Sequence, residues 1–391
     1  MAPLSARAVP SYSLISGSPC STCHTNAQGG GMRTSIGWAK AKSTGAFSWE
    51  DLGVSLLADR TSNEIVDGVS AGFDTRIQVA RLGRPRVRRD EAGEPKVVAP
   101  PRQVIPMQIE PYVRAELLDW LALEGSWSPG PTTFSQADFC SSTFAGQSCF
   151  TAQVSVEPDP PWPTVRVGVL QPSFGIRRDD HTNLIRHDAA RGGGDRTTLI
   201  PPNYAEPAAE ATIQPVHWFS ANASGFLAWN LSKAVGDSSV LAHPSFGGST
   251  RVLFSPRIDT DNLGSFTFRI GASALSAGRF AMVNGFFGIG WLDRASILTE
   301  AALLGFGGDQ QRRAWNLSTK LSVPIRDWLV VHGRFDQSTG RIAEGAPRVY
   351  SVTAGVKFHP LPWIELRPEY RYYRTDDWQM GQYTAQLHLF Y

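Results

Sequence analysis

The sequence contains few cysteines, few methionines and few charged residues, and it lacks long apolar runs. The charge balance and the lack of such runs exclude two classes of protein. Its 391 residues include 4 Cys and 5 Met, and 18% of them are charged. Lys and Arg (37) nearly balance Asp and Glu (35), which leaves a formal net charge of +2. A nucleic-acid-binding protein would carry a basic patch or stripe, so we expect no nucleic-acid partner. No run of about 18 apolar residues occurs, so we expect no transmembrane helix.

Residues 20–24 have the pattern Cys-x-x-Cys-His, which attaches c-type haem. The thiols of Cys20 and Cys23 would add to the porphyrin vinyl groups, and His24 would ligate the iron from the proximal face. A zinc ribbon needs a second Cys or His pair, and a redox dithiol needs a βαβ setting. The other two cysteines lie more than a hundred residues downstream. The motif therefore predicts one covalent haem c.

Such attachment requires export to an oxidising compartment. Residues 1–10 lack the charged and apolar regions of a signal peptide, although residues 5–8 (Ser-Ala-Arg-Ala) look like the end of a cleavage site. We therefore expect a removed signal or a misassigned start. Cys140 and Cys149 are candidates for a disulfide, with free thiols as the alternative.

The second iron ligand is open from sequence. Met32 is eight residues beyond His24, and the glycines at 29–31 permit the bend that would bring it round the porphyrin edge. A thioether ligand would raise the reduction potential relative to two imidazoles. Three histidines further along the chain, His332, His359 and His388, are the alternative, as is water.

Beyond the haem segment the chain alternates apolar and polar residues with no convincing helix. In the last ten residues, Tyr383, Ala385 and Leu387 fall on one face, and Gln382, Thr384 and Gln386 on the other. A period of two indicates a sheet with one apolar and one polar side. A soluble sandwich alternates too, but its strands are usually about 5–6 residues long. Stretches of about ten residues have the length that a tilted strand needs to cross a bilayer.

The pattern therefore predicts an all-β protein, a transmembrane antiparallel β-barrel of about 16 strands, with the haem segment lodged in its lumen. Three regions are expected: the haem segment (1–47), a link of uncertain structure (48–70) and the barrel (71–391). External loops are expected at 83–105, 128–147 and 173–207. The strands are expected near 71–82, 107–118, 120–127, 148–157, 164–172, 209–220, 222–233, 250–257, 264–274, 279–289, 294–304, 312–323, 326–337, 348–359, 362–373 and 380–391.

The sequence resembles the fused monohaem cytochrome–porins of the bacterial outer membrane. The resemblance is carried by the lead-in Pro-Ser-Tyr-Ser (10–13), by Cys-Ser-Thr-Cys-His-Thr (20–25) and by the barrel that follows. It implies an outer-membrane location and contact with membrane lipid. The best-known members oxidise Fe(II) outside the cell and usually carry a Pro-Phe-Gly-Arg-like stretch after the haem motif. This chain has a different sequence at 31–38, so the resemblance leaves the donor open.

Together these features predict an electron carrier rather than a classical enzyme. Electrons would pass between an extracellular donor or acceptor, with Fe(II) as one candidate donor, and periplasmic electron-carrier cytochromes. One alternative is a porin or transport barrel whose haem is a plug or a redox sensor. Another is a haem peroxidase-like enzyme that uses an open iron position.

Overall fold

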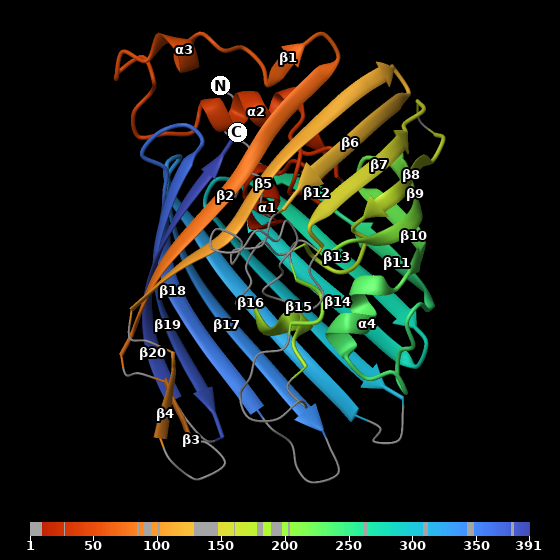
Figure 1. Cartoon of the computed structure of the whole chain (residues 1–391). Coiled ribbons are helices and arrows are strands. Elements are labelled where there is room, and N and C mark those ends of the chain that lie inside the picture. The colour runs from red at the N-terminus through yellow and green to blue at the C-terminus, as the bar shows by residue number, and fades with distance from the viewer. Residues whose placement is uncertain are drawn as a thin grey trace.

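The computed structural model describes most of the chain, and its strands form one large antiparallel sheet (Figure 1). The described residues are 10–26, 28–83, 86–89, 95–99, 102–128, 148–159, 161–177, 183–188, 198–201, 204–261, 264–307, 312–341, 348–376 and 379–391. Within these ranges no helix is long and apolar enough to span a membrane.

The large sheet closes on itself, because the last strand pairs with the first long one. Asp74 lies opposite Phe390, and this pairing continues to Leu82 opposite Gln382. Of the 18 strands in the sheet, two are short additions: β1 (Glu64–Val66) beside β2, and β12 (Arg257–Thr260) beside β13. The other 16 form the predicted closed barrel. They are β2 (Val69–Leu82), β5 (Arg102–Leu118), β6 (Leu121–Trp127), β7 (Phe150–Val156), β8 (Thr164–Leu170), β9 (Glu206–Val216), β10 (Phe219–Leu227), β11 (Phe246–Phe254), β13 (Gly264–Ala277), β14 (Phe280–Trp291), β15 (Ala295–Phe306), β16 (Arg312–Arg326), β17 (Leu329–Arg341), β18 (Arg348–Phe358), β19 (Ile364–Thr375) and β20 (Gln379–Phe390).

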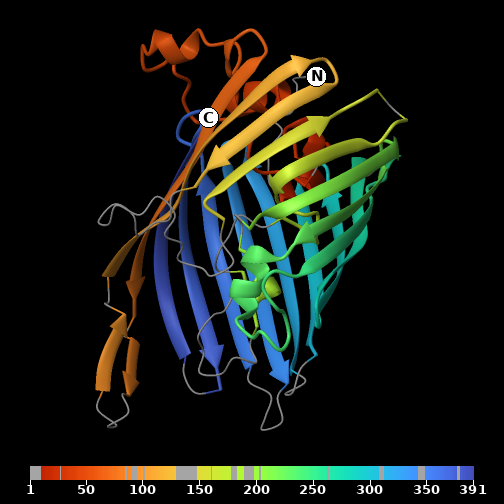
Figure 2. The same ribbon diagram turned by 45° about the vertical axis from the view of Figure 1, so that its right-hand side comes forward.

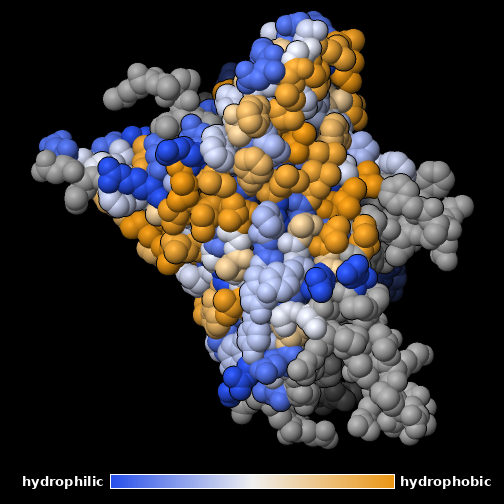
Figure 3. Space-filling model, turned by 90° about the vertical axis from the view of Figure 1, so that its left-hand side faces the viewer, coloured by the Kyte–Doolittle hydropathy of each residue, from blue (hydrophilic) through white to orange (hydrophobic). Residues whose placement is uncertain are grey.

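Alternation along each strand separates a lipid-facing wall from the lumen. In β20 the polar Gln382, Thr384 and Gln386 are buried inside, as predicted, whereas the side chain of Tyr383 is 64% exposed on the outside. Figure 3 shows the apolar side chains gathered in a belt across the outer wall. The barrel thus presents hydrocarbon to lipid and keeps its polar groups within.

The N-terminal segment lies inside one end of the barrel, the end at which the C-terminus also lies (Figure 2). We refer to it as the periplasmic end, because β3 (Arg86–Arg89) and β4 (Pro95–Ala99), from the predicted external loop at 83–105, lie at the other end (Figure 1). The segment contains α1 (Pro10–Ser16), a 3₁₀ turn (Cys20–Thr22) and α2 (Ser35–Lys42). The hydroxyl of Ser296 donates to the Ser11 carbonyl at 3.2 Å, and the Asp293 amide donates to the Ile15 carbonyl at 3.0 Å. These bonds attach α1 to β15 and to the turn before it.

The link predicted at 48–70 contains a short helix, α3 (Ser55–Ala58), and β1. An aromatic cluster seals the barrel end beneath it. The ring of Trp38, from α2, lies 5.2 Å from that of Trp363 and 5.9 Å from that of Tyr391, between ring centroids. Trp38 has no exposed surface. Helix α2 therefore packs against the C-terminal residue and the turn before β19.

One predicted strand is partly wrong. The strand expected at 222–233 ends at Leu227, and the chain turns into a helix, α4 (Trp229–Val235). The carboxylate of Glu206 accepts hydrogen bonds from the amides of Trp229, Asn230 and Leu231 at 2.7–3.0 Å, which satisfies the free donors at the helix start. The helix ends at Gly236, whose φ of 62° suits glycine. A carboxylate more than twenty residues earlier in the chain therefore stabilises the start of α4.

The segment expected as an external loop at 173–207 folds into the lumen instead, wherever it is described. The amide of Gly175 donates to the hydroxyl of Ser273 at 2.8 Å, and Asn316 donates to the Ile185 carbonyl at 2.9 Å. Leu199 and Ile185 join α4 in a buried apolar cluster against β13–β16. The expected loop at 83–105 contains a hairpin, β3 (Arg86–Arg89) with β4 (Pro95–Ala99), and the loop at 129–147 lies outside the described residues.

Candidate functional site

The Cys-x-x-Cys-His motif lies within the barrel, and its three functional side chains are buried. Cys20 is 8% exposed, Cys23 4% and His24 2%. The guanidinium of Arg269, on the inner face of β13, donates to the Cys20 sulfur at 3.3 Å. The sequence-predicted attachment residues are therefore brought together against the barrel wall.

Helix α2 holds the motif from the other side. The Thr34 hydroxyl donates to the Thr22 carbonyl at 2.7 Å and accepts from the Gly37 amide at 3.1 Å, so one side chain both caps α2 and binds the motif. A Cβ at Gly37 would lie 2.0 Å from the Cys23 carbonyl oxygen. Only glycine allows the helix this close to the motif.

Both cysteines are free thiols in the structure. Burial raises the pKa of the Cys23 thiol, against the lowering effect of the nearby charges on Lys40 and Arg33. A redox dithiol works through a thiolate with a lowered pKa. The environment of Cys23 therefore disfavours a redox dithiol. Cys149 is disulfide-bonded, and its predicted partner Cys140 lies outside the described residues.

Residues 24–26 and 28–33 form a narrow two-stranded ribbon. His24 and Arg33 are opposite each other in an antiparallel bridge, with the Thr25 amide bonded to the Met32 carbonyl at 3.2 Å. The tight bend between them uses the positive φ angles of Gly29, Gly30 and Gly31. Because side chains alternate along an extended chain, Met32 leaves the ribbon on the face opposite His24.

His24 faces two cavities. One, of about 920 Å³, is shared with Met32 and Arg33 and with the periplasmic ends of β5 and β7–β9. That volume falls in the range of small-molecule and cofactor sites. Two buried thiols, a buried imidazole beside them and this adjacent space fit a covalently attached haem.

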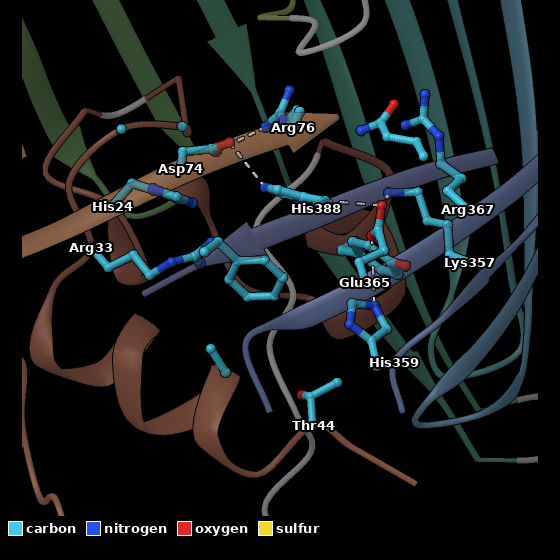
Figure 4. Close-up of a pocket in the computed structure, with 16 residues that line it drawn as sticks. His24, Arg33, Thr44, Asp74, Arg76, Lys357, His359, Glu365, Arg367 and His388 are labelled. Carbon is cyan, nitrogen blue, oxygen red and sulfur yellow. Dashed lines mark hydrogen bonds and ion pairs between the residues drawn. The ribbon is translucent and has the colours of Figure 1, made fainter. Parts of the chain in front are cut away.

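The second cavity, about 70 Å³, separates His24 from the barrel wall (Figure 4). His359 and His388, two of the candidate histidines, line it. The Nε2 atom of His388 is 3.1 Å from Asp74 Oδ1, and that of His359 is 3.6 Å from Glu365 Oε2. The third candidate, His332, lies elsewhere on β17, with its Nε2 atom 2.9 Å from Glu369 Oε1.

Sequence reasoning missed Arg33, Asp74 and Glu365. Asp74 comes from β2 and Glu365 from β19, and strand closure places both beside His388 on β20. Alternation along the strands places Asp74 and Glu365 on the lumen side, but a local pattern carries no information on which strands become neighbours.

The closed ring of 16 antiparallel strands with an apolar outer belt defines a porin-like outer-membrane barrel fold, and this fold fits the predicted outer-membrane location. Solved structures share it. OmpF of Salmonella typhi, in complex with daunomycin, superposes with a TM-score of 0.53 at 9% identity over 84% of this chain and 100% of that chain. OprB of Pseudomonas putida gives 0.52 at 10% identity over 90% and 99%.

An anion-selective porin of Comamonas acidovorans gives a TM-score of 0.51 at 11% identity, over 83% of this chain and 99% of that chain. The chain matches no known protein-family model and no curated protein. At such low identity the likeness establishes the fold alone.

Proposed function

We propose that this chain is an outer-membrane c-type cytochrome fused to a porin-like barrel. It carries electrons between an extracellular donor or acceptor, Fe(II) among the candidates, and periplasmic cytochromes. The observation that carries the proposal is the burial of Cys20, Cys23 and His24 inside the lumen, with a cavity of cofactor size beside His24.

The chain's own residues would do three things. Cys20 and Cys23 would hold the porphyrin by thioether bonds, and His24 would ligate the iron. The barrel wall and the aromatic cluster around Trp38 would keep water from the site, which lowers the local dielectric and strengthens its electrostatics. When bound, the haem would supply a one-electron Fe(III)/Fe(II) couple.

Two segments that lie inside the lumen also support this proposal over a general diffusion pore. The N-terminal segment occupies the periplasmic end of the lumen. Further from that end, Phe174 and Ile185 are part of a buried apolar cluster inside the barrel. A water-filled channel of the porin type would instead need a polar passage.

A transport barrel with the haem as a plug or sensor is the second candidate, favoured by the fold that the chain shares with porins. Purified protein in liposomes separates the two. We expect an external reductant to reduce cytochrome c trapped inside, while a trapped fluorescent solute of similar size to a sugar stays in. Solute release without reduction of the cytochrome would support the transport barrel and contradict the electron conduit.

The second iron ligand stays a prediction, and Met32→Ala tests it. We expect an unchanged visible spectrum, because the Met32 side chain leaves its ribbon away from His24. His359→Ala and His388→Ala, at the cavity shared with His24, are the companion variants, of which one should alter the low-spin spectrum. Loss of a far-red methionine-to-iron band in Met32→Ala would instead establish methionine as the ligand.

A further inference from the structure

Arg33 is placed beside His24 by the backbone itself. The bond from Thr25 N to Met32 O and that from Thr34 N to Cys23 O flank the pair, which makes His24 and Arg33 a non-hydrogen-bonded antiparallel pair. In such pairs the two side chains leave the same face and lie closest together, with Cβ atoms about 4.5–5.5 Å apart. Figure 4 shows both side chains extending toward the strands that carry Asp74 and His388.

The Arg33 side chain is held in a buried position. It is 9% exposed, and its guanidinium carbon lies 4.6 Å from the centre of the Phe390 ring. The side-chain amide of Asn63 donates to the Arg33 carbonyl at 3.3 Å, which fixes the backbone. Among the described residues, Arg33 Nε is buried with no hydrogen-bond partner. Its described side-chain contacts are the Tyr112 hydroxyl and the Phe390 ring, and neither is an anion. A buried cation without an anion is costly.

Every other Lys or Arg lining the two cavities at His24 is already paired with a carboxylate. Asp74 is close enough for the charge of Arg33 to act on it, but it is already paired with Arg76 at 2.9 Å and with His388 at 3.1 Å. The pairs are Arg76 with Asp74, Lys357 with Glu365, Arg367 with Glu369, Arg114 with Glu157 and Arg166 with Glu210. Among the described residues, Arg33 differs from these in having no carboxylate within ion-pair distance.

We propose that Arg33 binds a propionate carboxylate of the haem attached at Cys20 and Cys23, and that its charge raises the reduction potential. This inference rests on the proposed function. A guanidinium matches a carboxylate through two parallel hydrogen bonds. A cation buried near the iron favours the reduced form, because that form carries one positive charge fewer. Arg33 is thus a positioning residue for the haem.

The test uses the full-length haem-loaded protein and the variants Arg33→Gln and Arg33→Lys. The readouts are the midpoint potential from a spectroelectrochemical titration and the propionate bending band in the resonance Raman spectrum. Arg33→Gln should lower the potential and shift the band. Arg33→Lys keeps the charge but not the paired hydrogen bonds, so it should shift the band while holding the potential near that of the wild type.

Arg367→Gln is the matched control, because it removes a cation from the same cavity. Its partner Glu369 keeps Arg371 and His332 as neighbours. Both readouts should stay close to wild type in this control.

Two results would overturn the inference: unchanged readouts in a haem-loaded Arg33→Gln protein, or an equal loss of potential in Arg367→Gln. If Arg33→Gln fails to assemble, the Raman spectrum of Arg33→Lys is the test: a shifted propionate band supports the inference, and an unshifted band overturns it. A wild-type protein without haem would contradict the proposed function itself, which distinguishes the two failures.

Discussion

Replacing Cys20 and Cys23 together with Ala should remove covalently bound haem completely. These are the two thiols of the motif, and both are buried beside His24 in the lumen. Each single replacement should leave at most one thioether and weaken retention. The measurement is haem staining after denaturing electrophoresis, in a host that matures c-type cytochromes. His24→Ala should retain the stain but change the visible spectrum, because it alters a ligand and not an attachment point.

Cys149→Ser is the control for this series, since Cys149 is disulfide-bonded and outside the motif. It should stain like the wild type. Full staining of the double variant would mean that the haem is attached elsewhere, and the assignment of residues 20–24 would be wrong.

Val352→Arg should prevent or greatly weaken barrel assembly. Val352 lies near the middle of β18 with its side chain 49% exposed on the outer face, opposite Phe335 on β17. A lipid-facing Arg costs about 2–4 kcal/mol at the bilayer midplane. The measurement is the fraction of folded barrel in unheated samples on a denaturing gel, together with the urea midpoint of unfolding.

A matched pair of carboxylates tests the same claim one residue apart. Val352→Asp faces lipid, whereas Thr353→Asp faces the lumen, where Arg334 and Arg371 are its cross-strand neighbours. We expect Thr353→Asp to assemble normally and Val352→Asp to be impaired. Equal damage from both would contradict the assignment of inner and outer faces.

The barrel could be predicted because each strand carries its own alternating sequence pattern. In a lipid-facing strand, apolar and polar residues alternate over about ten residues, and this pattern can be recognised without knowing which strand is the partner. The strand predicted at 279–289 is β14 (Phe280–Trp291), and the one predicted at 380–391 is β20 (Gln379–Phe390). The predicted and observed bounds of these strands differ by a few residues at the ends, where hydrogen bonding to the neighbouring strand determines how far each strand extends.

Elements inside the lumen were not predictable in the same way. Helix α4 depends on Glu206, more than twenty residues earlier, to bind its first amides. The inward fold of residue 175 and its neighbours depends on hydroxyl and carboxylate groups of β13 and β15. The sequence shows Cys20, Cys23 and His24 as a motif, but the cross-strand position of Arg33 follows from a bend whose register only the folded chain displays.

The most direct test of the central claim is the haem content of the wild-type protein. Purified from outer membranes of a host competent for c-type maturation, it should stain for haem after denaturation. It should also give the pyridine haemochrome spectrum of one haem c per chain. A protein that assembles into the outer membrane as a folded barrel but carries no covalent haem would contradict the account.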